Sequence, residues 1–153
     1  MTKFIVKLKE LLAHLSHHNQ SIKLDAIHSL KEMITNNQEI IRLDMNNFLE
    51  NICPLFADRD YKVREACMQL FKTFILLPEM AKKSNSLEPF YSLLNVHLSC
   101  AMTHISENVQ YDSLKLLDIL IEHLPDLVRV NAYTIFENFV DQISKVLNYY
   151  TPQ

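Results

Sequence analysis

Hydrophobic residues recur with helical period along almost the whole chain. Apolar stripes at i, i+3, i+4 and i+7 spacing predict helices over about 3–17, 22–34, 45–57, 63–74, 87–105, 109–124 and 126–147. Polar segments and prolines separate these stripes, among them HHNQS, TNNQ, Pro78 with KKSNS, and Pro125. Asn19 or Ser21, and Asp60, stand where N-caps are expected, and a polar tail follows at 151–153.

One helical pattern repeats. The stretch DRDYKVREACMQLF, 58–71, has weaker echoes on both sides when Val63 is aligned with Ile22 and Val109. In each copy, a small residue stands four positions after the aligned residue: Ala26, Cys67 and Ser113. A large apolar residue follows four positions later: Leu30, Phe71 and Leu117. The separations, from 22 to 63 and from 63 to 109, match the period of about 40–47 residues of two-helix solenoid repeats.

This repetition predicts an all-α, right-handed α-solenoid of HEAT-like helical pairs. We expect one HEAT-repeat domain over 1–153, with repeat 1 at about 3–36, repeat 2 at about 38–78, repeat 3 at about 86–125 and a partial repeat 4 at about 126–148. Lys23 and Gln110 stand where Arg64 has the arginine usual in such repeats, so we expect a weakened ladder of polar contacts between repeats. The helix at 109–124 is apolar around much of its circumference, which indicates packing on two sides.

Composition supports an all-helical chain and excludes several classes of function. Glycine is absent from the 153 residues, which disfavours primed hairpin turns and phosphate-binding loops. The net charge is −3 with no long run of either sign, which argues against a sequence-specific nucleic-acid surface. No apolar run approaches the roughly 18 residues of a membrane span. The odd set Cys53, Cys67 and Cys100 fits a reducing compartment and small core positions.

Histidine clusters are the first candidates for chemistry. His14 and His18 have the i, i+4 spacing of metal-binding helices, with His17 and His28 nearby. The trio at 14–18 also sits at a predicted helix C-terminus, where the dipole favours cationic side chains, and we prefer that solvated interpretation.

A second candidate combines histidine, cysteine and carboxylates. His97 and His104 flank Cys100 on one predicted helix, but nothing supplies an oxyanion hole, so we favour a structural role such as hydrogen bonding into the following turn. Asp58 and Asp60 are interpreted as capping residues that accept from Arg59 or Arg64.

We therefore assign no catalytic, cofactor-binding or metal residue, and the partner-binding residues are left unknown. Tyr149 and Tyr150 are left open between a loose tail and a docking element. The last helical pattern carries more apolar residues than one neighbour can cover. We therefore expect a continuation of the parent chain, or another subunit, to cover it.

The last third of the sequence indicates a narrower class of protein within the helical-repeat proteins. Within 97–128, AMTHI followed by YDSLKLLDILIEHLP resembles the N-terminal domain of the testis-expressed protein ten/Ipi-one pre-rRNA-processing family. ENFVDQIS at 137–144 and the opening at 11–34 resemble the same family. Family members usually carry a lysine-rich segment before this domain and a long helical region after it. Neither is in the printed sequence, so we expect a fragment, a short isoform or a diverged paralogue.

The resemblance implies a scaffold and not an enzyme. It implies a subunit of a Rix-type complex in the nucleolus and nucleoplasm, with a WD-repeat protein and a larger helical-repeat subunit. Such a complex acts in pre-60S ribosome assembly, around removal of the second internal transcribed spacer and recruitment of a midasin-type ATPase. The alternative is a HEAT-repeat adaptor in nuclear transport or chromatin regulation.

Overall fold

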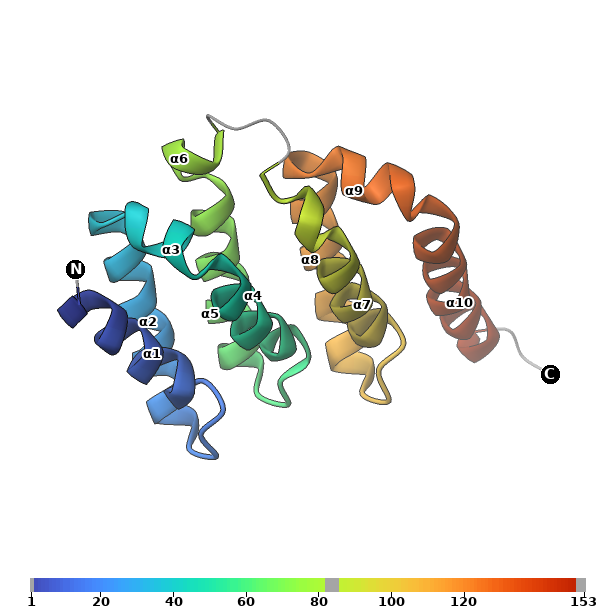
Figure 1. Cartoon of the computed structure of the whole chain (residues 1–153). Helices are drawn as coiled ribbons and strands as arrows, with labels where there is room; N and C mark the ends of the chain where they lie inside the picture. Colours follow the sequence, from blue (N-terminus) through green and yellow to red (C-terminus); the bar gives the residue numbers. More distant parts are fainter. Residues whose placement is uncertain (1, 82–85, 151–153) are drawn as a thin grey trace.

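The computed structural model describes residues 2–81 and 86–150, without the side chain of Ala81, and this part of the chain contains helices and no strand (Figure 1). The elements are α1 (Thr2–His14), α2 (Gln20–Asn36), α3 (Glu39–Leu43), α4 (Met45–Ile52), the 3₁₀ helix η1 (Cys53–Ala57), α5 (Tyr61–Ile75), α6 (Pro78–Ala81), the 3₁₀ helix η2 (Glu88–Phe90), α7 (Tyr91–Met102), α8 (Glu107–His123), α9 (Pro125–Val130) and α10 (Ala132–Tyr150).

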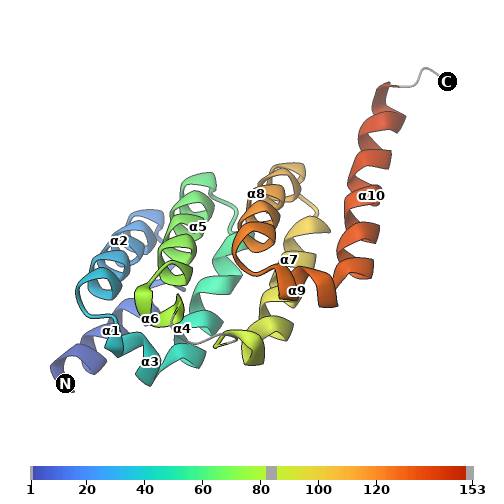
Figure 2. The same ribbon diagram turned by 90° about the horizontal axis from the view of Figure 1, so that it is seen from above.

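The longer helices form two layers (Figure 2). The A layer contains α1, α4 with η1, α7 and α10; the B layer contains α2, α5 and α8. Between the layers, α1 packs against α2, η1 against α5, and α7 against α8, while α2, α5 and α8 also pack side by side. Stacked helical pairs of this kind define an α-solenoid, so the predicted fold class is confirmed.

The repeated residues of the sequence occupy the core. Ala26, Cys67 and Ser113 are buried, and the Cys67 Sγ atom lies 3.1 Å from the carbonyl oxygen of Ile52 in the A layer. The large residues that follow them are buried as well. Phe71 is fully buried, with its ring centroid 5.4 Å from Phe56 and 6.4 Å from Phe74. The buried apolar side chains form one continuous core that runs through the repeats.

The two predicted B-layer caps are confirmed. The Asn19 side chain accepts hydrogen bonds from the backbone N–H groups of Ser21, at 2.8 Å, and Ile22, at 3.4 Å. Asp60 accepts in the same way from Lys62, at 2.8 Å, and Val63, at 3.4 Å. Each cap satisfies two of the N–H groups that a helix start leaves without a partner, and so fixes where α2 and α5 begin.

Several predicted boundaries were wrong. The first helix ends at His14 and not at 17, and the helix predicted at 45–57 changes to 3₁₀ geometry at Cys53, beside Pro54. The helix predicted at 87–105 begins as η2 and ends at Met102, which leaves Ile105 97% exposed in the next turn. The short helices α3 and α6 were missed, and Pro78 begins α6 instead of a loop. The predicted loop residues 82–85 and the tail 151–153 lie outside the described residues.

The predicted helix at 126–147 is two helices. Asn131 separates α9 from α10, and its backbone N–H and side-chain Nδ2 both donate to the carbonyl oxygen of Leu127, at 3.2 and 2.9 Å. An asparagine side chain that competes for backbone partners is a common way to end a helix. The break lets α10 turn back along α7 as the last helix of the A layer.

Candidate functional site

A row of polar contacts joins the three B-layer helices near their N-termini. The Lys23 Nζ atom of α2 lies 2.6 Å from the Asp58 Oδ2 atom, in the turn before α5. From α5, the Nε and Nη2 atoms of Arg64 each lie 2.9 Å from the Asp112 Oδ2 atom of α8. We call Lys23, Asp58, Arg64 and Asp112 the polar ladder.

Arg64 is the centre of the ladder. Its side chain is 3% exposed, and its Nη1 atom donates to the carbonyl oxygens of Asp58, at 2.7 Å, and Arg59, at 3.1 Å. Asp112 also lies near a second cation, because its Oδ1 atom is 3.4 Å from Lys115 Nζ. The planar guanidinium group is suited to such multiple contacts, which a lysine ammonium group cannot reproduce.

The ladder bears on two predictions. Lys23 joins α2 to the turn before α5 in place of arginine, but it makes one ion pair where Arg64 makes several contacts, which fits the expected weakening. The Asp58 carboxylate accepts from Lys23 and from the backbone N–H of Asp60, at 3.0 Å, and not from the side chain of Arg59 or Arg64. Gln110 does depart from the pattern, since its amide donates to the carbonyl oxygen of His104 in its own repeat.

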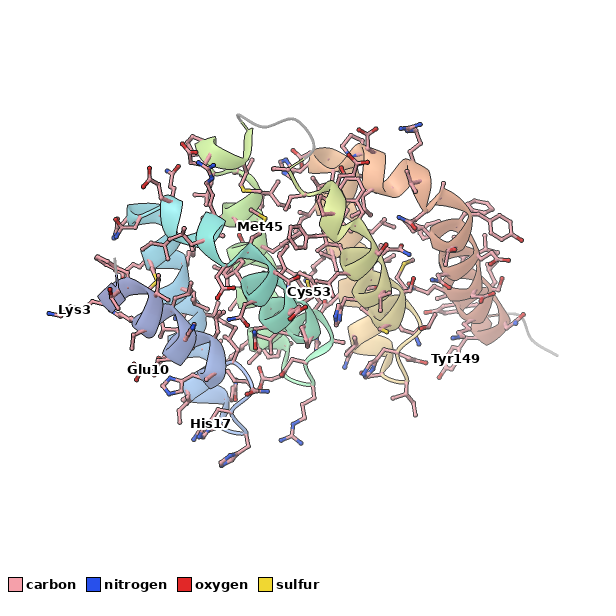
Figure 3. The ribbon with its side chains drawn as sticks, viewed as in Figure 1. Lys3, Glu10, His17, Met45, Cys53 and Tyr149 are labelled. Atoms are coloured by element: carbon pink, nitrogen blue, oxygen red, sulfur yellow. The ribbon has the colours of Figure 1, made fainter. Side chains whose placement is uncertain are left out.

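The N-terminal histidines lie at the turn between α1 and α2. His17 and His18 follow the end of α1, with their rings stacked at 4.4 Å, and His17 Nδ1 accepts from the backbone N–H of Asn19 at 3.0 Å (Figure 3). His14 and His28 are exposed. Among the described residues, no three His, Cys, Asp or Glu side chains are placed to hold a metal ion.

The three candidate residues around Cys100 do not all belong to one helix. His97 is half-buried in α7, where burial lowers the pKa of its imidazole, and Cys100 is exposed. His104 lies beyond the end of α7, and its Nδ1 atom accepts from the backbone N–H of Ser106 at 3.0 Å, which confirms the predicted hydrogen bond into the turn.

The cysteines divide into two groups. Cys53 and Cys67 are buried core residues, as predicted, and Cys53 lies in the middle of the stack (Figure 3). Burial raises the pKa of the Cys53 thiol to about 12, and burial together with the nearby Cys53 and Asp58 raises the pKa of Cys67 well above its ordinary value. The same core placement was wrong for Cys100.

The structure has two surface features of note, of which the sequence pattern indicated only the second. The first is a groove of about 370 Å³ between α5 and α8, with Tyr61 and Glu65 on one wall, Asn108 and Tyr111 on the other, and Met68 among the residues that line it. The groove is lined by two helices that are far apart in the sequence, so no single stretch of sequence encodes it.

The second feature is the exposed surface of α10. Only Ile135 is buried among its 19 residues, while Phe136, Phe139, Val140, Ile143 and Val146 are 66%, 38%, 40%, 43% and 56% exposed. These five residues follow i, i+3, i+4, i+7 and i+10 spacing, and we call them the α10 apolar face. Tyr149 and Tyr150 belong to the last turn of α10, with Tyr149 at the free end of the helix (Figure 3), so they are not a loose tail.

None of the described helices is long and apolar enough to cross a membrane. The fold and surface instead define a helical-repeat protein whose visible features are grooves and exposed helix faces.

Comparison with known proteins identifies the family. A family model described as "Rix1 complex component involved in 60S ribosome maturation" matches residues 85–151. The Testis-expressed protein 10 homolog of Danio rerio is 36% identical over 138 residues, which are 90% of this chain and 14% of that protein. The pre-rRNA-processing protein ipi1 of Schizosaccharomyces pombe is 26% identical over 127 residues, 82% of this chain and 29% of that protein.

A solved structure supports the fold. A chain of a Rix1–Rea1 pre-60S particle matches with a TM-score of 0.75 at 20% identity, over 90% of this chain and 56% of that one. The chain belongs to the family of testis-expressed protein 10 and the Ipi1 pre-rRNA-processing proteins. It spans a small part of the length of the relatives that it matches, 14% in the zebrafish protein and 29% in the fission-yeast protein.

Proposed function

We propose that this chain is a non-catalytic scaffold subunit of a Rix-type complex that acts in pre-60S ribosome assembly and in removal of the second internal transcribed spacer. The observation that carries the proposal is the match of residues 85–151 to a Rix1 complex component involved in 60S ribosome maturation. The match covers α7, α8, α9 and α10, and therefore includes the α10 apolar face.

The surface chemistry supports a binding role. The polar ladder and the caps engage Asp58, Asp60, Arg64 and Asp112 in contacts within and between repeats, which leaves these groups committed to structure. The exposed apolar side chains of α10 are instead suited to contact with other proteins. The partners that we propose are a WD-repeat protein, a larger helical-repeat subunit and a midasin-type ATPase, in the nucleolus and nucleoplasm.

Fractionation of nuclear extract tests this function. The tagged chain, expressed at its natural level, should sediment with pre-60S particles and copurify with the three proposed partners. Its depletion should increase the amount of precursor RNA that still contains the second internal transcribed spacer. Copurification with transport cargo or chromatin subunits, with normal processing of this precursor, would instead support the alternative of a nuclear-transport or chromatin adaptor.

A further inference from the structure

The groove between α5 and α8 lies in the B layer, where these two helices pack side by side (Figure 2). Side chains four residues apart on a helix lie one turn apart on the same side. Two rows of this kind border the groove: Tyr61, Glu65 and Gln69 on α5, and Tyr111, Lys115 and Ile119 on α8. The groove is therefore built from the faces of two neighbouring repeats, and its two ends can differ in chemistry.

One carboxylate of the groove has no partner. Four charged side chains line the groove, and three of them are paired with one another: Arg64 with Asp112 in the polar ladder, and Lys115 Nζ with Asp112 Oδ1 at 3.4 Å. Glu65, the fourth, is exposed and makes no hydrogen bond or ion pair with any residue that the structure describes. Its carboxylate is therefore free to pair with a cation from outside the chain.

Two exposed tyrosines stand beside this carboxylate. Tyr61 comes one turn before Glu65 on α5, and Tyr111 has on α8 the repeat position that Glu65 has on α5. The two tyrosines are 59% and 69% exposed, and within the described part of the chain neither packs against another ring or makes a side-chain hydrogen bond. Exposed aromatic rings attract cations through their faces, so the rings and the carboxylate favour the same kind of ligand.

We propose that this groove binds an arginine side chain in an extended segment of a partner protein, with the guanidinium group beside Glu65 and against Tyr61 and Tyr111. The planar guanidinium group stacks on aromatic rings and pairs with a carboxylate through two N–H groups, which a lysine ammonium group cannot do. The groove has a volume of about 370 Å³, near the lower end of the range of small-ligand sites, about 300–1,000 Å³. It therefore fits one long side chain with its neighbours, and not a helix. The proposal goes beyond the scaffold function and does not depend on it.

Short peptides test the proposal. Three capped serine-rich peptides carry leucine two places before and after a central position, which holds arginine, citrulline or glutamate; in an extended segment these three side chains share one face. Citrulline has nearly the shape of arginine without its charge. Each peptide is titrated into the full chain while backbone amide signals are followed by NMR. The arginine peptide should bind about fivefold more tightly than the citrulline peptide, because only arginine gains the ion pair and the cation–ring contact. The signals of 61–69 and 108–119 should shift most.

Matched variants separate the carboxylate from the rings. Glu65→Gln should reduce the preference for arginine over citrulline to about twofold. Tyr111→Leu should weaken binding of the arginine peptide about threefold, whereas Tyr111→Phe keeps a ring and should change it little. Both residues are exposed, so the melting temperature should stay the same. Asp118→Asn is the control, since Asp118 is an exposed carboxylate of α8 outside the lining of the groove, and this change should leave the preference for arginine intact.

Equal affinities for the arginine and citrulline peptides would overturn the proposal, and so would equal effects of Tyr111→Leu and Tyr111→Phe. A glutamate peptide that binds as tightly as the arginine peptide would also overturn it, because Lys115 and not Glu65 would then select the ligand. Peptide binding and the test of function can fail separately. A chain that prefers the arginine peptide but is absent from pre-60S particles keeps this site and loses the proposed function. A chain present in the particles without that preference loses only the site.

Discussion

Replacement of Arg64 by methionine should lower the free energy of unfolding by about 3 kcal/mol. Methionine keeps most of the buried aliphatic part of the Arg64 side chain and lacks the guanidinium group, which contacts Asp112 and two backbone carbonyl oxygens. Breaking a buried ion pair from one side typically costs about 3–5 kcal/mol. We expect the lower end, because the Asp112 side chain is 16% exposed and stays near Lys115.

Lys23→Met is the matched control. Lys23 occupies the equivalent position one repeat earlier, but it makes a single contact with Asp58 and is 19% exposed. Loss of this one charge-assisted hydrogen bond should cost about 1–2 kcal/mol. Arg64→Met combined with Asp112→Leu should be less destabilising than the sum of the two single changes by at least about 1 kcal/mol, because the double variant leaves no buried carboxylate without its partner.

Urea unfolding followed by circular dichroism measures these differences, with the midpoint expected to fall and the m-value to stay constant. Equal losses of unfolding free energy in Arg64→Met and Lys23→Met would contradict the reasoning. So would a double variant, Arg64→Met with Asp112→Leu, whose loss equals the sum of the two single losses. Either result would mean that the bonds of Arg64 stabilise the contact between α5 and α8 no more than the single pair of Lys23 and Asp58 stabilises its own contact.

Three further predictions concern the core, its two thiols and the N-terminal histidines. Phe71→Ala should cost about 3–5 kcal/mol in urea unfolding through lost burial and a cavity, whereas Phe136→Ala should cost within about 0.5 kcal/mol of zero; equal costs would contradict the assignment of the core. The raised pKa values of Cys53 and Cys67 mean that only the unfolded thiols ionise above about pH 8.5, so stability should fall between pH 8 and 10 by about 2 kcal/mol per thiol. The unfolding free energy should depend less on pH in a variant with alanine at 53 and 67. An unchanged slope would show that the two buried thiols do not cause the pH dependence. Zinc or a chelator should leave the melting temperature unchanged; a stoichiometric metal in the purified protein would reverse our interpretation of His14 and His18.

The layers of this fold could be predicted from sequence because they depend on local periodicity. Ala26, Cys67 and Ser113, and the large residues four positions after each of them, lie on the buried faces of the B-layer helices. The caps at Asn19 and Asp60 depend on backbone groups two or three residues away, so sequence also indicates them correctly.

The features that could not be predicted from sequence depend on contacts between repeats or on single helical turns. The pairing of Lys23 with Asp58, and of Arg64 with Asp112, requires the offset between neighbouring helices, which no local pattern contains. Helices α3 and α6 have five and four residues, too short for a periodic stripe. The break at Asn131 comes from one amide side chain inside an otherwise continuous apolar pattern.

The polar ladder lies along one edge of the stack, and the opposite edge is held differently. Near the N-termini of the B-layer helices, Arg64 is buried and joins α5 to α8 through two short contacts. Between α3 and α6, the pair of Arg42 and Glu79 is 3.3 Å apart and more exposed, with 44% and 25% of the two side chains accessible, so salt screens it more strongly. We therefore expect the solenoid to be stiffer along the edge that carries the polar ladder than along the α3–α6 edge, where the distance between repeats should vary more. On binding a curved partner, the repeats should move relative to one another along the α3–α6 edge, while the structure within each repeat changes little.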